Sequence, residues 1–308
     1  MRISEFTEKK DTFLDHLKIE RNMSHNTVRA YAADLKQFIE FWNEIERTEQ
    51  QALPLQQTIE RFFVHLYYKK IDKSSIARKM SCFKSFEKFI KTFGKDLSLK
   101  LTRPRVDKKL PVYLSVDEIF HLLDTVQDSD LPGRHPKRDK AILELLYATG
   151  IRCSELIGIH IRDINIEDKV IRIYGKGRKE RIALFGEKAK ARIIEYLSEE
   201  RPHTTNRDEH LFVSYRNTPL TTRSVQRIFE MFRKFLKVDR HITPHKIRHS
   251  FATHLLNQGV DLRVVQELLG HKTLASTERY THVTSAQLAE MCDTIHPIHD
   301  MTKKVPAE

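Results

Sequence analysis

The chain has 308 residues, of which 40% are hydrophobic and 31% are charged, with a net charge of +12 and a pI near 9.5. This length suits one large domain or two ordinary ones, and the lack of an apolar run of about 18 residues excludes a transmembrane helix. The N-terminus lacks the apolar segment of a signal peptide. Three isolated cysteines (Cys82, Cys153 and Cys292) indicate a reducing cytoplasm and argue against a structural zinc site.

Positive charge is concentrated in one stretch of the chain. Residues 69–109 contain 14 Lys or Arg and 4 Asp or Glu, whereas the other residues contain 40 basic and 38 acidic side chains. A basic run is often only a solvated helix face. In a cytoplasmic protein, a patch of this density favours a nucleic acid as the partner.

Residues 1–100 show four amphipathic helical patterns and no strand signal, which predicts a small helical bundle. Ser24 and Ser74 are expected to cap the second and fourth helices. The aromatic side chains fall at core positions rather than at positions for base stacking. The polar face of the fourth helix carries basic groups placed to meet a phosphate backbone, namely Arg78, Lys79, Lys84, Lys88 and Lys91.

Residues 101–114, LTRPRVDKKLPVYL, predict a basic linker, because two prolines and four basic residues leave little to bury. The alternative is an ordinary surface loop. The lengths of the flanking regions favour a boundary between a helical DNA-binding domain over residues 1–100 and a second domain over residues 115–308.

The second domain begins with a helix that Ser115 is expected to cap, and a later helix ends at Gly150. Arg152 follows, with Glu155 placed to orient its guanidinium. A lone arginine after a helix is most often structural. Residues 170–185 predict a hairpin whose turn, GKGRKER, contains Lys176. The turn lacks the spacing of a Walker motif.

A helical pattern around residues 225–235 begins near Arg223 and Arg227, which lie four positions apart on one face. Either a phosphate contact or simple solvation fits this pair equally well.

The stretch from Thr243 to Tyr280 is the densest in reactive side chains. Thr243 and Pro244 predict a helix start, with His245 and Arg248 three positions apart on one face. Such a helix end suits a phosphate, although an HxxR pair is more often a solvated face.

A second helix, between Asp261 and Gly270, is expected to bury Leu262, Val265, Leu268 and Leu269. His271 follows at once and Tyr280 comes nine residues later. Taken singly, this histidine suits a helix cap and this tyrosine suits half-buried packing.

Together these residues form a longer pattern. HKIRHSFATHLL followed by LLGHKTLASTERYTHV resembles the C-terminal signature of the tyrosine recombinases, the phage-integrase superfamily, and in particular the Xer recombinases of bacteria. ATGIRCSEL is similar to the family's first catalytic motif, with Ile151 and Cys153 where leucine and valine are usual. IERNMSHNTVRAYAADLKQF resembles the family's core-binding domain. The resemblance implies six catalytic positions, which are Arg152, Lys176, His245, Arg248, His271 and Tyr280.

Strand transfer without a cofactor requires a nucleophile that keeps the phosphodiester energy in a covalent bond, and the resemblance assigns this role to Tyr280. Arg152 and Arg248 would hold the non-bridging oxygens, and Lys176 would protonate the leaving 5′ oxygen. His245 would act as base or hydrogen-bond partner, and His271 would bind the scissile phosphate. Neither a cofactor nor a metal is expected.

The resemblance also implies the fold and the assembly. The fold is expected to be mainly α with a small β-sheet in the C-terminal domain, and the two domains are expected to clamp double-stranded DNA. Four protomers, as a homotetramer or with a second Xer recombinase, would exchange strands through a Holliday junction. A C-terminal helix over Ser285–Cys292 would contact a neighbouring protomer.

The resemblance to Xer proteins suggests resolution of chromosome dimers at dif sites during cell division. The ending HPIHDMTKKVPAE departs from the HPR-type ending of Xer proteins, which bears on the partner contact and on regulation by an FtsK-type translocase. The alternatives are an integrase of a mobile element and a DNA-binding protein without catalysis. The second is disfavoured because all six catalytic positions are filled.

Overall fold

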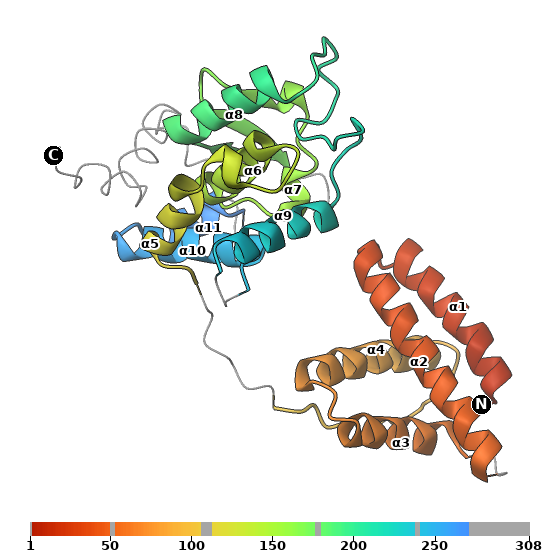
Figure 1. Ribbon diagram of the computed structural model, residues 1–308. Coiled ribbons are helices and arrows are strands. Elements are labelled where there is room, and N and C mark those ends of the chain that lie inside the picture. Colours follow the sequence, from red (N-terminus) through yellow and green to blue (C-terminus); the bar gives the residue numbers. More distant parts are fainter. Residues whose placement is uncertain (1, 50–52, 106–112, 176–179, 238–240, 271–308) are drawn as a thin grey trace. The chain divides into compact units, whose positions relative to one another are not determined.

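The computed structural model describes residues 2–49, 53–105, 113–175, 180–237 and 241–270 (Figure 1). The chain divides into two compact units, Met1–Leu110 and Pro111–Glu308. Helices dominate both units and the second contains a small sheet, so the predicted fold class is confirmed. No helix among the described residues is both long enough and apolar enough to span a bilayer.

The described part of the first unit contains four helices, as its sequence pattern predicts. They are α1 (Ile3–Ile19), α2 (His25–Glu49), α3 (Leu55–Tyr68) and α4 (Lys73–Lys91). Ser24 precedes α2, and its hydroxyl accepts a hydrogen bond from the Thr27 backbone N–H at 3.2 Å. The predicted cap of α4 is wrong by two positions. Asp72 is the cap, and its carboxylate accepts from the Ser74 backbone N–H at 2.8 Å, because a carboxylate also favours the positive end of the helix.

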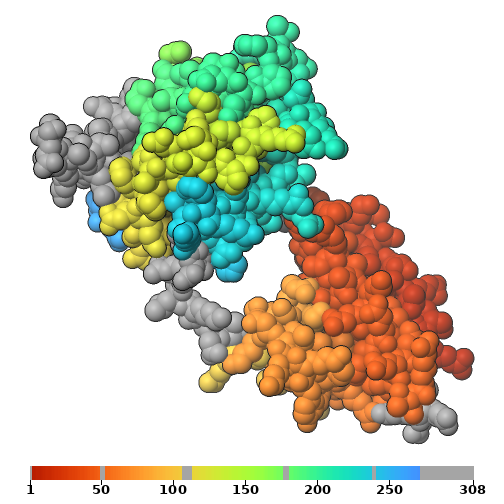
Figure 2. Space-filling view, viewed as in Figure 1, coloured from red at the N-terminus to blue at the C-terminus, as the bar shows by residue number. Residues whose placement is uncertain are grey.

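Aromatic rings form the core of this unit. Phe38 of α2 lies with its ring centroid 5.2 Å from Phe6 of α1, 5.4 Å from Phe62 of α3 and 5.1 Å from Phe83 of α4. One side chain therefore contacts all three other helices, and the aromatic residues are core residues as predicted. Figure 2 shows the outer surface of these helices, coloured red to orange.

In the described part of the second unit, helices surround a three-stranded antiparallel sheet. Its helices are α5 (Val116–Phe120), α6 (Pro136–Thr149), α7 (Cys153–Leu156), α8 (Glu187–Glu199), α9 (Thr222–Phe235), α10 (Pro244–Asn257) and α11 (Leu262–Leu268). Its strands are β1 (Ile164–Asn165), β2 (Val170–Tyr174) and β3 (Glu180–Leu184), in the order β1-β2-β3. Single turns of π-helix (His121–Thr125) and 3-10 helix (Asp128–Asp130, Ile161–Asp163) complete the description.

Strands β2 and β3 form the predicted hairpin, with Ile171 opposite Ala183 and Ile173 opposite Arg181. Strand β1 was not predicted, because two residues are too short to show an alternating pattern. Ser115 begins α5 with the predicted cap, accepting from the Glu118 backbone N–H at 3.1 Å, while the Glu118 carboxylate accepts from the Ser115 N–H at 2.7 Å.

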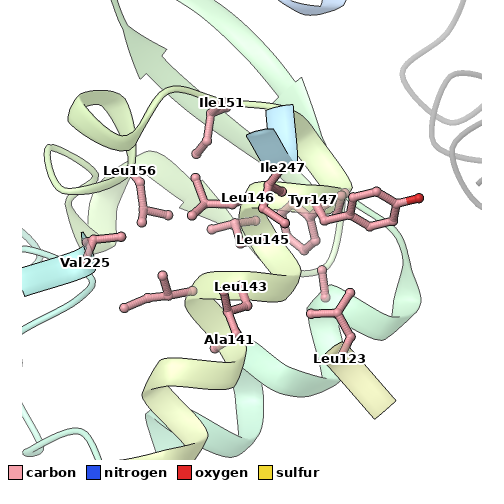
Figure 3. Close-up of a cluster of buried hydrophobic side chains, with 14 of the residues drawn as sticks. Leu123, Ala141, Leu143, Leu145, Leu146, Tyr147, Ile151, Leu156, Val225 and Ile247 are labelled. Carbon is pink, nitrogen blue, oxygen red and sulfur yellow. The ribbon is translucent and has the colours of Figure 1, made fainter. Parts of the chain in front are cut away.

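Helix α6 is the centre of the second unit. Leu145 and Leu146 have no exposed surface, and α6 contacts both α8 and α10. Figure 3 shows its apolar side chains meeting Val225 of α9 and Ile247 of α10. Because α6 is enclosed on several sides, it is a rigid support for the segment that follows it.

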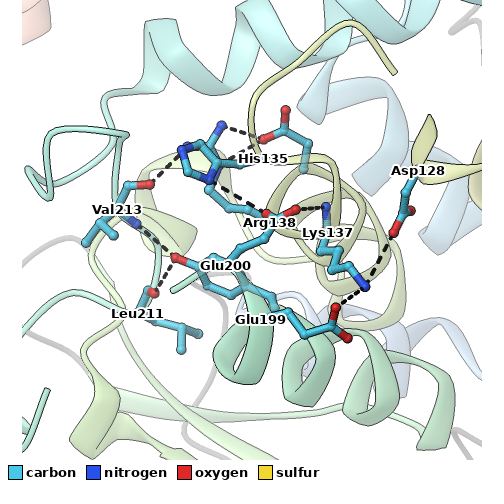
Figure 4. Close-up of polar contacts among 10 residues, drawn as sticks. Asp128, His135, Lys137, Arg138, Glu199, Glu200, Leu211 and Val213 are labelled. Atoms are coloured by element: carbon cyan, nitrogen blue, oxygen red, sulfur yellow. Dashed lines mark hydrogen bonds and ion pairs between the residues drawn. The ribbon is translucent and has the colours of Figure 1, made fainter. Parts of the chain in front are cut away.

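Charged groups anchor the start of α6 (Figure 4). The Glu200 carboxylate accepts hydrogen bonds from the backbone N–H groups of Lys137 and Arg138, both at 2.9 Å. A carboxylate at this position satisfies first-turn donors and interacts favourably with the helix dipole. The Lys137 ammonium lies 2.7 Å from the Glu199 carboxylate, so α6 is joined to the end of α8.

Glu144 is an exception inside this core. Its side chain is 2% exposed, and its Oε2 has no hydrogen-bond partner among the described residues. Burial raises the pKa of Glu144 to about 7, and the positive charge of Lys188 only partly opposes this. An acid with a raised folded-state pKa lowers stability as pH rises, because the unfolded chain ionises first.

Glu144→Gln should therefore raise the free energy of unfolding at pH 8 by up to about 3 kcal/mol, at roughly 1.4 kcal/mol per pKa unit. The penalty accumulates between the unfolded value of 4.5 and about 7, so the gain should nearly vanish below pH 4.5. Urea titrations at pH 8 and at mildly acidic pH measure both values. Glu180→Gln, which removes an exposed carboxylate from β3, is the control. An equal effect of Glu144→Gln at both pH values would contradict the explanation.

Candidate active site and nucleic-acid interface

Arg152 lies between α6 and α7, and Glu155 holds it in the way the sequence predicts. The Arg152 backbone N–H donates to Glu155 Oε2 at 2.8 Å, and its Nη1 donates to Oε1 at 2.7 Å. The Arg152 side chain is 40% exposed, whereas that of Glu155 is 5% exposed. One edge of the guanidinium is thus fixed by a buried carboxylate and the other remains accessible to a ligand.

Arg248 lies in the second turn of α10, which starts where predicted. The Thr243 hydroxyl accepts from the Lys246 backbone N–H at 3.3 Å, and Pro244 is the first helical residue. Arg248 Nη1 donates to the Gly150 carbonyl and Nη2 to the Leu269 carbonyl, each at 2.6 Å. The guanidinium therefore joins the end of α6 to the end of α11 and keeps the rest of its five N–H donors for other acceptors.

Arg152 and Arg248 belong to one electrostatic site. The pKa of Arg248 is lowered to about 10, chiefly by burial, and the charge of Arg152 lowers this pKa more than the charge of Glu155 raises it. The Arg248 guanidinium is still cationic at neutral pH. Two cations held close together by the fold favour an anion between or beside them, and their planar donors match phosphate oxygens.

Arg181 of β3 is a third guanidinium at this site, and the sequence interpretation missed it. Its Nη2 donates to Glu155 Oε2 at 2.8 Å and its Nη1 to the Leu268 carbonyl at 3.1 Å. Burial lowers the pKa of Arg181, and the charge of Glu155 opposes this. A signal was available, because Arg181 is two positions from Ala183 on the inward face of the strand.

Glu155 stays ionised in this surrounding. Burial alone would raise its pKa, but the Arg152 backbone N–H and the charges of Arg181 and Arg152 together lower it below the ordinary value. Glu155 is thus a buried anion that organises two arginines.

Of the other four predicted catalytic residues, the structure describes only His245. His245 is exposed in the first turn of α10, one turn before Arg248. Lys176, between β2 and β3, lies outside the described residues, as do His271, Tyr280 and the predicted helix Ser285–Cys292.

Helix α11 ends as predicted before Gly270, and Val265 and Leu269 are buried. The expected burial of Leu262 is wrong. Its side chain is 55% exposed, because it stands in the first turn, before the helix reaches the core.

Gly150 determines how closely the elements of the site approach. Its φ is +58°, and a Cβ atom there would lie 2.4 Å from Phe251 Cδ1 and 2.9 Å from Leu269 Cδ2. Phe251 and Leu269 belong to the core under Arg248, so this position requires glycine for both conformation and space.

Gly150→Ala should lower the free energy of unfolding by about 2–5 kcal/mol, combining left-handed strain with overpacking. Gly259→Ala is the matched control, since Gly259 has φ +85° and open space around it. It should cost only about 1–2 kcal/mol. Urea unfolding of both variants measures the difference, and equal losses would exclude the steric explanation.

The predicted DNA contacts of α4 differ in their surroundings. Lys84 and Lys88 are exposed on one face, four positions apart. Lys79 is 7% exposed, and its ammonium lies 2.8 Å from Asp34 Oδ1 and 2.6 Å from Gln37 Oε1. Lys79 is thus a buried partner of α2, which corrects its placement on the polar face. The pattern misled because a buried aspartate on another helix cannot be seen from α4 alone.

Arg78 also contacts Asp34, although its own side chain is 44% exposed. On α9, Arg223 and Arg227 are both exposed. The described residues contain no group of three or more His, Cys, Asp or Glu side chains arranged to hold a metal ion.

Two family descriptions match the sequence. Residues 113–287 match the phage integrase family, and residues 11–93 match the phage integrase N-terminal SAM-like domain. The chain belongs to the phage integrase family, the tyrosine recombinases. The SAM-like match covers most of the four-helix unit, and the integrase match covers the unit that holds Arg152, Arg181 and Arg248.

Relatives of this tyrosine recombinase are Xer proteins. It is 37% identical over 292 residues to tyrosine recombinase XerD of Halalkalibacterium halodurans, covering 92% of this chain and 96% of that protein. It is 39% identical to tyrosine recombinase XerC of Staphylococcus epidermidis, covering 94% and 97%. The chain is therefore a Xer-type recombinase, an enzyme of site-specific DNA recombination.

A solved structure has the same fold. The XerH site-specific recombinase bound to its difH substrate, in a pre-cleavage complex, aligns with a TM-score of 0.66 at 24% identity. The alignment covers 89% of this chain and 82% of XerH.

Proposed function

We propose that this recombinase cuts and rejoins duplex DNA at a dif-like site through a 3′-phosphotyrosine intermediate and a Holliday junction. The observation that carries the proposal is the pairing of Arg152 and Arg248 around the end of α6. Arg248 donates a hydrogen bond to the carbonyl of Gly150, which is 98 positions away in the sequence. Gly150 in turn lies two residues before Arg152. Two guanidiniums held near the end of α6, with the Arg152 side chain 40% exposed, suit a phosphodiester that gains negative charge in its transition state.

In the proposed cleavage step, the Tyr280 oxygen attacks the scissile phosphorus. A bond forms between them, and the bond from phosphorus to the 5′ oxygen breaks. His245 is the base or hydrogen-bond partner of the tyrosine. Lys176 gives a proton to the leaving 5′ oxygen, and His271 holds the phosphate. Attack by a 5′ hydroxyl of the partner strand reverses these changes and rejoins the DNA.

Arg152 and Arg248 serve the same step by binding the non-bridging oxygens. Glu155 prevents Arg152 from turning away, and the two carbonyl acceptors do the same for Arg248. A guanidinium whose direction is already fixed stabilises developing charge without reorganising, which is the main source of such catalysis.

Basic surfaces of both units supply the sequence-independent grip on the duplex. Lys84 and Lys88 in the first unit, and Arg223 and Arg227 in the second, are exposed and suited to phosphate contacts. Arg78 is proposed as a further phosphate contact of the first unit, because its side chain is 44% exposed even though it also pairs with Asp34. The basic stretch 101–114 is the proposed tether between domains 1–100 and 115–308, which would close around the DNA as a clamp.

The biological role is proposed from the relatives. Likeness to XerC, XerD and a XerH that binds difH favours resolution of chromosome dimers at a dif-like site during cell division, in the cytoplasm. Four protomers would act on two sites, as a homotetramer or with a second Xer recombinase. Control by an FtsK-type translocase belongs to the same proposal.

Covalent trapping tests the function directly. The full chain is incubated with a nicked suicide substrate that contains a dif-like site, because loss of the short cleaved fragment prevents rejoining. An adduct that survives denaturation is the expected result. Specific binding to another site, with no adduct on the dif-like site, would favour the mobile-element alternative. Binding without an adduct, even when a second Xer recombinase is added, would count against catalysis.

A further inference from the structure

The Arg181 side chain makes two hydrogen bonds that join the hairpin to other segments of the site. Arg181 is the only described residue whose side chain binds both the Glu155 carboxylate and the last turn of α11, through Nη2 and Nη1 respectively. The Arg181 side chain is 17% exposed, compared with 40% for Arg152. The Arg181 side chain is therefore less accessible to a DNA phosphate than that of Arg152.

The backbone at the end of α11 fits closely against Arg181. Gly270 has φ +66°, and a Cβ atom there would lie 2.6 Å from Arg181 Nε and 2.7 Å from Cδ. Arg248 binds the neighbouring carbonyl of Leu269. Two guanidiniums thus hold consecutive carbonyls at a helix C-terminus, where cations interact favourably with the helix dipole. Gly270 follows these two residues, and His271 follows Gly270.

The Glu155 carboxylate is shared unequally between its two partners. Its Oε1 accepts from the Arg152 side chain, and its Oε2 accepts from both the Arg152 backbone and Arg181. Without Arg181, Oε2 would lose a charged donor inside the protein, and rotation of the carboxylate would become easier. The direction of the Arg152 guanidinium depends on that rotation.

We propose that Arg181 is a positioning residue of the recombinase, which orients Arg152 through Glu155. It also fixes the end of α11, from which the chain continues to His271. The role rests on the proposed function, since it assists the same cleavage step. It connects the hairpin that carries Lys176 with the two other segments of the site.

The test is the single-turnover rate of adduct formation by the full chain on two suicide substrates. One has the natural scissile phosphodiester, and the other has a methylphosphonate, in which a methyl group replaces one charged oxygen. Arg181→Gln should slow the phosphodiester reaction by about 10–100-fold, the usual effect of losing a supporting partner. The methylphosphonate reaction should slow less, because its transition state carries less negative charge on the non-bridging oxygens for Arg152 to stabilise.

Three further variants separate positioning from folding. Arg172→Gln removes an exposed arginine from β2 and should react at the wild-type rate on both substrates. Adding Arg181→Gln to Glu155→Gln should slow the reaction by a smaller factor than Arg181→Gln does in the wild-type chain, because the effect that passes through Glu155 is already lost. Arg181→Lys keeps the charge but cannot bridge both acceptors. It serves as the second variant if the glutamine variant does not fold, and its loss should again be larger on the phosphodiester.

A wild-type rate for Arg181→Gln, or equal slowing on both substrates, would overturn the positioning role while leaving the proposed function intact. Failure of the wild-type chain to form any adduct would instead overturn the proposed function and this role with it.

Discussion

Replacing Tyr280 with phenylalanine should abolish the covalent protein–DNA adduct while leaving DNA binding unchanged. The phenol oxygen is the only atom removed, and it is the atom that would form the bond to phosphorus. The C–H group that remains at this ring position in phenylalanine cannot attack phosphorus. The measurement is denaturing electrophoresis of a suicide-substrate reaction, together with a native gel shift for binding.

Tyr174→Phe is the matched control. Tyr174 ends β2 and is 41% exposed. The substitution therefore removes an accessible phenol oxygen from the same unit and leaves the proposed nucleophile unchanged. Its adduct should form at the wild-type level. An adduct that persists in Tyr280→Phe would reject Tyr280 as the nucleophile.

Arg248→Lys should lower the rate of adduct formation by about 10²–10³, with a smaller effect on DNA binding. Lysine keeps the positive charge but presents a point charge on a flexible chain, and it cannot bind two carbonyls and a phosphate in one plane. One of the Gly150 and Leu269 carbonyls would lose its donor, so stability should also fall, by about 1–3 kcal/mol.

Single-turnover rates and urea unfolding separate the two effects of Arg248→Lys. Arg263→Lys, at an exposed position on the neighbouring helix α11, should change neither quantity. A rate loss below tenfold in Arg248→Lys would show that charge alone suffices, and it would contradict the geometric role given to the guanidinium.

Much of the local structure follows from short patterns in the sequence. Thr243 with Pro244 starts α10, Ser115 starts α5, and glycines with positive φ follow α6 and α11. These features depend on neighbouring residues only, since a cap needs a side-chain oxygen within three positions and a left-handed turn needs the absence of Cβ. The pairing of Arg152 with Glu155 belongs to the same class, being three positions apart.

The sequence also carries the family signature, because its motifs are long and their spacing is specific. From this signature come the expected catalytic positions and the fold class. The match of residues 113–287 to the phage integrase family agrees with that resemblance.

Tertiary structure decided what local patterns cannot express. Lys79 looks like a surface base on α4, yet Asp34 of α2, 45 positions away, makes it a buried ion-pair partner. Arg181 looks like one more charge in a basic turn, yet Glu155 and the Leu268 carbonyl give it a place beside the active site. The physical reason is the same in both cases. A charge leaves water only when a partner compensates its desolvation, and that partner comes from a distant segment that the fold alone brings near.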